Sequence, residues 1–266
     1  MLNRQQIAQF DQDGAVTIDT PLTTTELETL RDTYDNLFPG PDTEAGREKS
    51  RHSRTADFFD QPLVDLIQHP FFEKVAAKAL CANAVRFANI ALSKTYPRPE
   101  EKFDFIQHTD VQYSVSDLDA TPRRMTCSFF IWIDDVNEKR APLMYRRGSH
   151  RQIAEWRQRH PRYQNEVPRV HGTTEDNLPS LDYEPAQPIV AKAGQVSVLT
   201  TALVHGPSTN VDNKCRYACH LSYTSDEFDI ELPEPKQNVR VGYYRALRDY
   251  LRPDRLHLVG AYRTNK

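Results

Sequence analysis

From Val85 onward the chain consists of short strand-like segments, and this texture limits the fold more than anything else in the sequence. The segments are apolar or alternate polar with apolar residues, and Pro, Gly, Asn or Asp separates them. Such short strands between turn residues are typical of β-sandwiches and barrels. We predict an all-β core, a double-stranded β-helix (jelly roll, cupin-like), because that fold leaves one end open for a site. The expected strands are 85–96, 103–113, 124–133, 143–147, 188–191, 195–201 and 214–224.

Helical patterns dominate the chain before this core. We expect helices over residues 3–12 and from Thr25, where Glu28 completes capping-box spacing, with a short strand at 15–18 between them. A polar loop over 40–57 and a helix over 63–80, broken near His69 and Pro70, should follow. We expect a single domain over 1–266, made of N-terminal helices 1–84, a jelly-roll core 85–225 with an insertion at 151–187, and a C-terminal extension 226–266.

Composition narrows the possible partners. Charged residues make up 27% of the chain and the net charge is -3, which gives no case for nucleic acid. No apolar run approaches membrane length, and the N-terminus lacks a signal-peptide pattern, so we expect a cytoplasmic protein that binds a small-molecule substrate. The four cysteines form no CxxC pair, and we expect reduced thiols.

Three residues suggest a metal site. His108 and Asp110 stand two apart in an expected strand, so their side chains should point the same way. His205, at the end of an apolar run, can supply a third ligand. Two imidazoles and one carboxylate form the facial triad of non-heme Fe(II) oxygenases. A His-x-Asp pair alone is weak evidence, because strands carry it by chance and a lone buried His is more often a hydrogen-bonded core residue.

The order of the motifs along the chain is more specific than the triad. They are Gln107-His108-Thr109-Asp110, Trp132-Ile133-Asp134-Asp135, Ala141-Pro142-Leu143, Arg147-Gly148-Ser149-His150-Arg151, Val204-His205-Gly206 and Arg216. This order resembles that of the phytanoyl-CoA dioxygenase-like family of Fe(II)/2-oxoglutarate oxygenases, over about residues 7 to 225.

The resemblance implies an enzyme that uses Fe(II), 2-oxoglutarate and O2 to oxidise an unactivated C–H bond and releases succinate and CO2. Hydroxylation is the default outcome, and desaturation, ring closure or epoxidation would use the same site. Two other readings remain open: a metal-binding jelly-roll protein without turnover, and a metal-dependent hydrolase or isomerase that uses the same triad. Neither of them requires Arg216.

Arg216 fits the remote carboxylate of a dicarboxylate cosubstrate, because a guanidinium makes a planar two-pronged contact with a carboxylate. The resemblance places the family's 2-oxoglutarate arginine at this position. It also makes Thr126, Trp132 and Lys94 candidate cosubstrate residues. Two positions depart from the pattern: Ala218 stands where relatives often have Ser, and Arg147 stands where Pro is usual.

Residues 146–171 suggest the substrate class. This segment has seven arginines against two glutamates, a local charge of +5 in a chain of net charge -3. A solvated helix face explains any one of these arginines, but together they would favour an anionic substrate at a cleft. We expect Arg146 to contact a carboxylate or phosphate of the substrate and Tyr113 to line the pocket.

Overall fold

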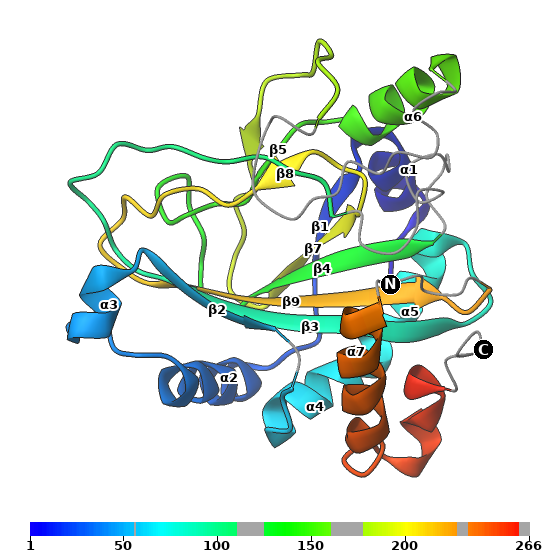
Figure 1. The fold of residues 1–266 in the computed structure, drawn as a ribbon, viewed down its shortest axis with the longest axis horizontal. Helices are drawn as coiled ribbons and strands as arrows, with labels where there is room; N and C mark the ends of the chain where they lie inside the picture. Colours follow the sequence, from blue (N-terminus) through cyan, green and yellow to red (C-terminus); the bar gives the residue numbers. More distant parts are fainter. Residues whose placement is uncertain (56, 111–124, 161–177, 228–233, 261–266) are drawn as a thin grey trace.

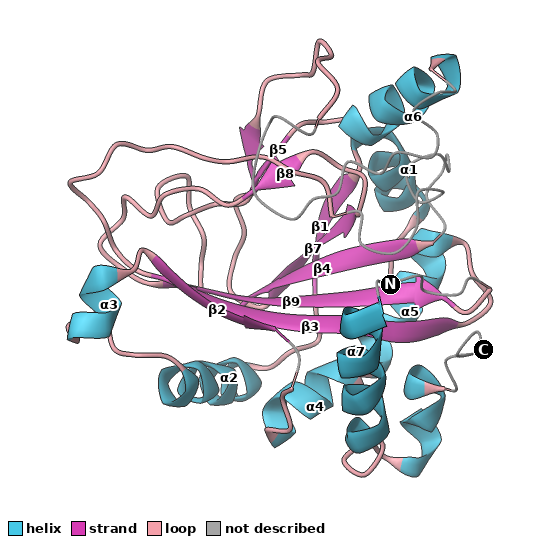
Figure 2. Ribbon diagram, viewed as in Figure 1, coloured by secondary structure: helices cyan, strands magenta, loops and turns pink. Residues whose placement is uncertain are grey.

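The protein is described here from a computed structural model, which places residues 1–55, 57–110, 125–160, 178–227 and 234–260 (Figure 1). Two antiparallel sheets form its core and helices pack around them (Figure 2), which confirms the predicted fold class. The strands are β1 Ala15–Asp19, β2 Arg51–Thr55, β3 Val85–Thr95, β4 Thr126–Trp132, β5 Met144–Tyr145, β6 Gln187–Pro188, β7 Gln195–Thr200, β8 His205–Gly206 and β9 Arg216–Ser225. The helices are α1 Arg4–Asp13, α2 Thr24–Leu37, α3 Glu44–Glu48, α4 Gln61–Ile67, α5 Pro70–Leu80, α6 Ser149–Arg159, α7 Glu234–Leu247 and a 3-10 helix Pro253–Val259.

The large sheet has the strand order β1-β7-β4-β9-β3-β2, and the small sheet has the order β6-β5-β8. Figure 1 shows α2, α4 and α7 on one side of the large sheet and the small sheet on the other, and α5 shares a hydrophobic core with α2 and α4. The large sheet therefore has an outer face toward these helices and an inner face toward the small sheet.

Alternation along β9 separates these two faces. Cys219, Leu221 and Tyr223 belong to the main hydrophobic core, which also contains buried residues of α2, α4, α5 and α7. The residues of β9 that alternate with this set, among them Arg216 and His220, point to the inner face. The outer face thus stabilises the fold, which leaves the inner face available for polar chemistry.

The helical predictions before Val85 are confirmed, with one shift at the start of α2. The N-cap is Thr23, whose side chain accepts a hydrogen bond from the Glu26 amide, and the capping box joins these two residues instead of Thr25 and Glu28. An N-cap needs an extended backbone, and Thr23, two residues after the breaker Pro21, has φ -79° and ψ 162°. The break at His69 and Pro70 separates α4 from α5, as predicted.

Two predictions for loops and strands are wrong. Residues 40–57 contain α3 and β2, and β2 pairs with β3 at the edge of the large sheet. At the other edge of this sheet, β1 pairs with β7. The N-terminal region therefore adds two strands, β1 and β2, to the jelly roll. The predicted strand 103–113 forms no regular strand over its described part, 103–110, which makes only isolated bridges at Phe105 and His108.

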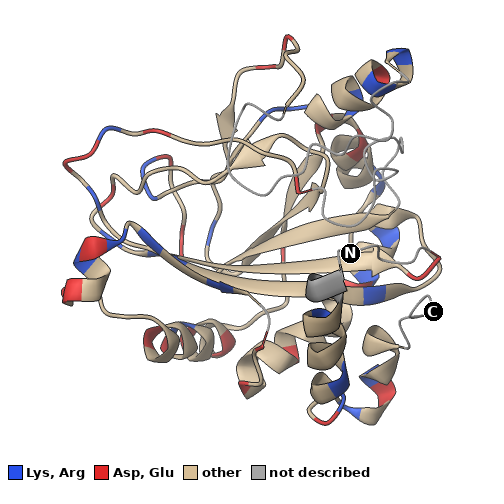
Figure 3. Ribbon diagram, in the orientation of Figure 1, with Lys and Arg blue, Asp and Glu red and all other residues tan. Residues whose placement is uncertain are grey.

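The C-terminal extension packs against the outer side of the core. The Tyr243 hydroxyl donates to the carbonyl of Phe58 at 3.0 Å, and Leu247 is fully buried. Figure 3 shows that charged residues of both signs lie mainly on helices and loops. All four cysteines are free thiols. No helix in the described part of the chain combines the length and apolarity needed to cross a membrane.

Candidate metal centre and cosubstrate site

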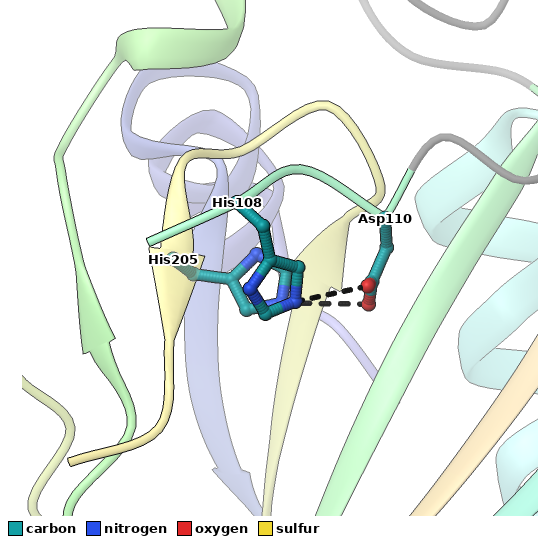
Figure 4. A group of neighbouring side chains, drawn as sticks. All are labelled: His108, Asp110 and His205. Atoms are coloured by element: carbon teal, nitrogen blue, oxygen red, sulfur yellow. Dashed lines mark ion pairs between the residues drawn. The ribbon is translucent and has the colours of Figure 1, made fainter. Parts of the chain in front are cut away.

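His108, Asp110 and His205 lie together at the end of the small sheet (Figure 4). One Asp110 oxygen is 3.3 Å from His108 Nε2 and the other is 3.4 Å from His205 Nε2. The three ligand atoms lie within 4.8 Å of one another, and no other such group of His, Cys, Asp or Glu occurs among the described residues. The structure therefore brings the predicted triad together.

Backbone pairing brings the two imidazoles together. The His108 amide donates to the His205 carbonyl at 2.8 Å, and the His205 amide donates to the His108 carbonyl at 2.9 Å. Residues directly opposite in an antiparallel pair direct their side chains to the same face. The Asp110 amide donates to the Thr201 carbonyl at 2.7 Å, which fixes the third ligand on the same segment.

Gly206 permits this close approach. A Cβ at Gly206 would lie 1.8 Å from the carbonyl oxygen of Ile106, so any larger residue would push the Ile106–Asp110 segment away. The glycine in the His-Gly motif is thus required by the backbone that carries the first two ligands.

His205 is oriented by its own backbone and by a corner of the chain. Its Nδ1 lies 2.8 Å from the Leu203 carbonyl, so this nitrogen is the donor and Nε2 is left free to bind a cation. The Val204 amide donates to the Ser149 hydroxyl at 2.9 Å. Arg147, which replaces the family's usual Pro, donates two hydrogen bonds to Asp13 at 3.0 and 3.1 Å and ties the corner to α1.

The electrostatics of the triad favour a cation. Burial raises the pKa of Asp110, but His205 and His108 outweigh it and hold this pKa well below its usual value. Burial lowers the pKa of His205, and Asp110 outweighs it and raises this pKa. The carboxylate is therefore ionised, and a metal ion held by the two imidazoles would provide the positive charge beside it.

The residues fit a divalent metal ion such as Fe(II). Three ligands at about 2.1 Å on one face of an octahedron would lie about 3 Å apart, close to the two distances seen here. The side chains of His108 and Asp110 remain 21% and 16% exposed, whereas that of His205 is 2% exposed. The open side of the site therefore lies over His108 and Asp110.

Arg216 is a buried cation on the inner face of β9, 3% exposed. It donates to the Thr95 hydroxyl at 3.0 Å, and its guanidinium lies 5.9 Å from the centre of the Trp132 ring. Burial, with a smaller contribution from the charge of Arg51, lowers the pKa of Arg216 to about 10. No carboxylate of the described residues pairs with it, so the site provides a buried guanidinium that lacks an anion.

Trp132 and Thr126 also lie on the inner face, as predicted, at opposite ends of β4. The Trp132 indole donates to the Ser197 hydroxyl at 3.0 Å, and Phe130 fills the space between this ring and His205, with ring centres 6.2 and 6.1 Å away. Thr126 donates to the Thr224 hydroxyl at 3.3 Å. Trp132 thus adjoins Arg216, whereas Thr126 lies at the far end of the strand from it.

The structure does not bring Lys94 into the site. Lys94 pairs with Tyr217 in the β3–β9 register, on the opposite face from the pair of Thr95 and Arg216. Its ammonium group makes an ion pair with Asp35 of α2 at 2.6 Å. Strand alternation therefore directs this lysine to the helices and away from any cosubstrate on the inner face.

The predicted substrate residues have different positions. Arg146 follows Tyr145, the partner of His205 in the small sheet, and so points to the opposite face, where its Nε donates to the Gln107 side chain at 2.7 Å and its Nη1 to the Glu184 carbonyl at 3.1 Å. Of the other arginines in the basic segment, Arg147 pairs with Asp13 and Arg159 with Glu155. Tyr113 lies outside the described residues.

Two further inner-face residues were not among the predicted site residues. Arg51 of β2 stands opposite Thr95. His220 of β9 stands opposite Phe130, with ring centres 4.9 Å apart, and its Nε2 lies 3.3 Å from the Ser222 hydroxyl. The alternation of β9 after Arg216 already predicts His220, whereas nothing in the polar segment 40–57 signals a strand.

A cleft of about 1140 Å³ lies away from the triad. Its walls include Arg31, Arg140 and Lys192, which pair with Asp134, Asp212 and Asp135. These three cations are already paired with carboxylates, whereas the ligands of the triad converge on one point, so we place the site at the triad.

Comparison with known proteins agrees with this geometry. The family model described as phytanoyl-CoA dioxygenase (PhyH) matches residues 10–218, which include the triad and Arg216. A search of curated proteins finds no match.

Solved structures show the same fold. SnoK, an alpha-ketoglutarate-dependent carbocyclase from nogalamycin biosynthesis, is 21% identical, with a TM-score of 0.62 over 84% of each chain. SnoN, an epimerase from the same biosynthesis, is 14% identical, with a TM-score of 0.60 over 83% of this chain and 82% of its own. Apo EctD from S. alaskensis is 19% identical, with a TM-score of 0.58 over 86% of this chain and 79% of its own.

Proposed function

Because the chain belongs to the phytanoyl-CoA dioxygenase family, we propose that it is an Fe(II)- and 2-oxoglutarate-dependent dioxygenase. It hydroxylates an unactivated C–H bond of a small anionic molecule, and 2-oxoglutarate and O2 are converted to succinate and CO2. The observation that carries this proposal is the combination of a three-ligand metal centre at the small sheet with a buried, anion-free arginine on the inner face of the large sheet.

Each residue has a defined part in this reaction. His108, Asp110 and His205 would hold the Fe(II) ion and would leave its remaining ligand positions open. Bound Fe(II) with 2-oxoglutarate supplies the oxidising chemistry. Arg216 holds the remote carboxylate of the cosubstrate, and Thr95 holds the guanidinium in place. Trp132 and Phe130 form an aromatic wall that keeps water from the space between arginine and metal.

The two other readings explain less of the site. A hydrolase or isomerase, or a metal-binding protein without turnover, could use the triad but has no need for Arg216. Burying an unpaired guanidinium is costly, and a site retains one where a ligand pairs with it. A dicarboxylate cosubstrate fits that requirement.

The proposed anionic substrate rests on Arg146. Its guanidinium is held next to the first metal ligand through Gln107, and Tyr183 lies beneath it at 6.0 Å. Strand alternation directs Arg146 to the other face of the small sheet from His205, so this cation would meet a carboxylate or phosphate on a part of the substrate that extends beyond the metal. Arg146→Gln should then raise the KM of the best substrate, and the effect should shrink with added salt. Arg159→Gln, which removes an exposed arginine of α6, is the matched control.

The test of the function is succinate formation from 2-oxoglutarate with Fe(II) and O2, screened over small carboxylates, phosphates and neutral controls. We expect one or more anionic compounds to raise succinate formation well above the rate without substrate, and to gain one oxygen atom by mass spectrometry. The same mass gain with only neutral compounds would contradict the anionic substrate. No succinate with any compound, from a protein shown to hold Fe(II), would contradict the dioxygenase.

A further inference from the structure

Arg51 and Arg216 lie in one row across the inner face of the large sheet. Thr95 is opposite Arg51 in the β2–β3 pair and opposite Arg216 in the β3–β9 pair. Residues directly opposite in an antiparallel sheet direct their side chains to the same face. Both guanidinium groups therefore lie on the inner face, on either side of the Thr95 hydroxyl.

Neither arginine has a carboxylate partner within the described ranges, and the two cations repel each other. Arg216 donates to the Thr95 hydroxyl, and the charge of Arg51 helps to lower its pKa. Two like charges in one row of a sheet are destabilising unless an anion lies between them. An anionic ligand bound between the guanidinium groups of Arg51 and Arg216 would explain this arrangement.

The row borders an open part of the inner face. Arg51 and Ser53 of β2 are exposed, and Ala91 and Ser93 of β3 are only partly covered, although all four lie on this face. His220 and Phe130, toward the metal centre, are also partly covered. A ligand can thus enter along β2 and β3 and reach both the metal and the two arginines.

We propose that Arg51 is a second carboxylate-binding residue, which together with Arg216 grips the remote carboxylate of the cosubstrate. This inference rests on the proposed function, since it names a further residue of the same site. Arg216 gives the buried, directional contact, and Arg51 gives a longer-range attraction at the entrance. Because Arg51 is exposed, its contribution should depend on salt more strongly than that of Arg216.

The test is calorimetric titration of 2-oxoglutarate into the Fe(II)-loaded protein without oxygen. The variants are Arg51→Gln, Arg51→Lys, Arg216→Gln and Arg54→Gln. Arg54 is the matched control, because it belongs to the same edge strand but points to the opposite face, over the Phe58 ring at 5.2 Å. A second ligand, 2-oxopentanoate, has the same chain length and 2-oxo acid group but lacks the remote carboxylate.

We expect Arg51→Gln to raise the Kd for 2-oxoglutarate about tenfold in low salt, and Arg51→Lys to recover part of the loss. The Kd for 2-oxopentanoate should stay within about twofold of the wild-type value, as should both constants in Arg54→Gln. Added salt should reduce the difference between wild type and Arg51→Gln.

Two results would overturn the inference, and they differ from failure of the function. An unchanged Kd for 2-oxoglutarate in Arg51→Gln, with weakened binding in Arg216→Gln, would remove Arg51 from the site and leave the proposed function intact. An equal loss for 2-oxoglutarate and 2-oxopentanoate would show a general disturbance instead of a carboxylate contact. If the wild-type protein binds Fe(II) but no 2-oxoglutarate, the proposed function fails as well.

Discussion

His108 and His205 form a backbone pair in which the amide of each donates to the carbonyl oxygen of the other, at 2.8 and 2.9 Å. This pair joins two segments that are distant in the chain and places both imidazoles on one side. The metal centre is therefore built into the pairing of the backbone, and its geometry depends on residues that hold this pair as well as on the ligands.

Replacement of a ligand should abolish iron binding without unfolding the protein. His205→Ala leaves two ligands, which hold the metal poorly and no longer fix its open positions. We expect bound iron, measured by elemental analysis after gel filtration, to fall from about one per chain to near zero, with an unchanged circular dichroism spectrum. His257→Ala is the control, because this exposed histidine lies in the C-terminal 3-10 helix and pairs with Glu73. Retention of iron by His205→Ala would contradict the assignment.

Replacement of Arg216 should weaken 2-oxoglutarate binding, whereas replacement of Lys94 should not. Arg216→Ala removes a guanidinium from a desolvated carboxylate site, and we expect a cost of about 2 kcal/mol or more, roughly a thirtyfold rise in the Kd for 2-oxoglutarate. Lys94→Met should leave this Kd unchanged while lowering the melting temperature, because it breaks the ion pair with Asp35. A large rise in the Kd for Lys94→Met would contradict the placement of this lysine on the outer face.

Gly206→Ala should damage the metal centre from the backbone. Its Cβ would lie 1.8 Å from the Ile106 carbonyl oxygen, so the segment that carries His108 must shift. We expect a loss of about 1–3 kcal/mol of unfolding free energy together with weaker iron binding. Gly242→Ala, in α7, has open space around the added Cβ and should be neutral or slightly stabilising. Equal stability and equal iron binding in Gly206→Ala and Gly242→Ala would argue against the close approach of Gly206 to the Ile106 carbonyl.

Ser149→Ala should loosen His205 from a distance. The Ser149 hydroxyl accepts the Val204 amide at 2.9 Å in a buried position, and its loss leaves that donor unsatisfied. We expect a destabilisation of about 1–3 kcal/mol in urea unfolding and a measurable rise in the iron Kd. Ser149→Thr is the control, because it keeps the hydroxyl that accepts the Val204 amide. Iron binding should therefore be closer to wild type in Ser149→Thr than in Ser149→Ala. Unchanged iron binding in Ser149→Ala would limit this corner to a role in stability.

The parts of the site that could be predicted from sequence are those where burial produces a pattern. The alternation of β4 and β9 separates an outer face packed on helices from an inner face, and it places Trp132 and Arg216 correctly. The same alternation puts Lys94 with Leu92 on the outer face, so the resemblance that suggested this lysine conflicted with a pattern already visible in the strand.

The parts that sequence could not reveal lack such a pattern. β2 is an edge strand whose residues are mostly exposed, so no apolar alternation marks it, and Arg51 went unnoticed. His108 and Asp110 do not belong to a regular strand: an isolated bridge joins His108 to β8, and one backbone hydrogen bond joins Asp110 to Thr201. That approach depends on the missing Cβ of Gly206, which sequence periodicity does not encode.

The most direct test of the central claim is diffraction at the iron absorption edge from crystals grown without oxygen with Fe(II) and 2-oxoglutarate. The account predicts one strong anomalous peak within bonding distance of His108 Nε2, His205 Nε2 and an Asp110 oxygen, with a dicarboxylate extending from it to the Arg216 guanidinium. An iron peak at any other place, or a cosubstrate carboxylate that does not reach Arg216, would contradict it.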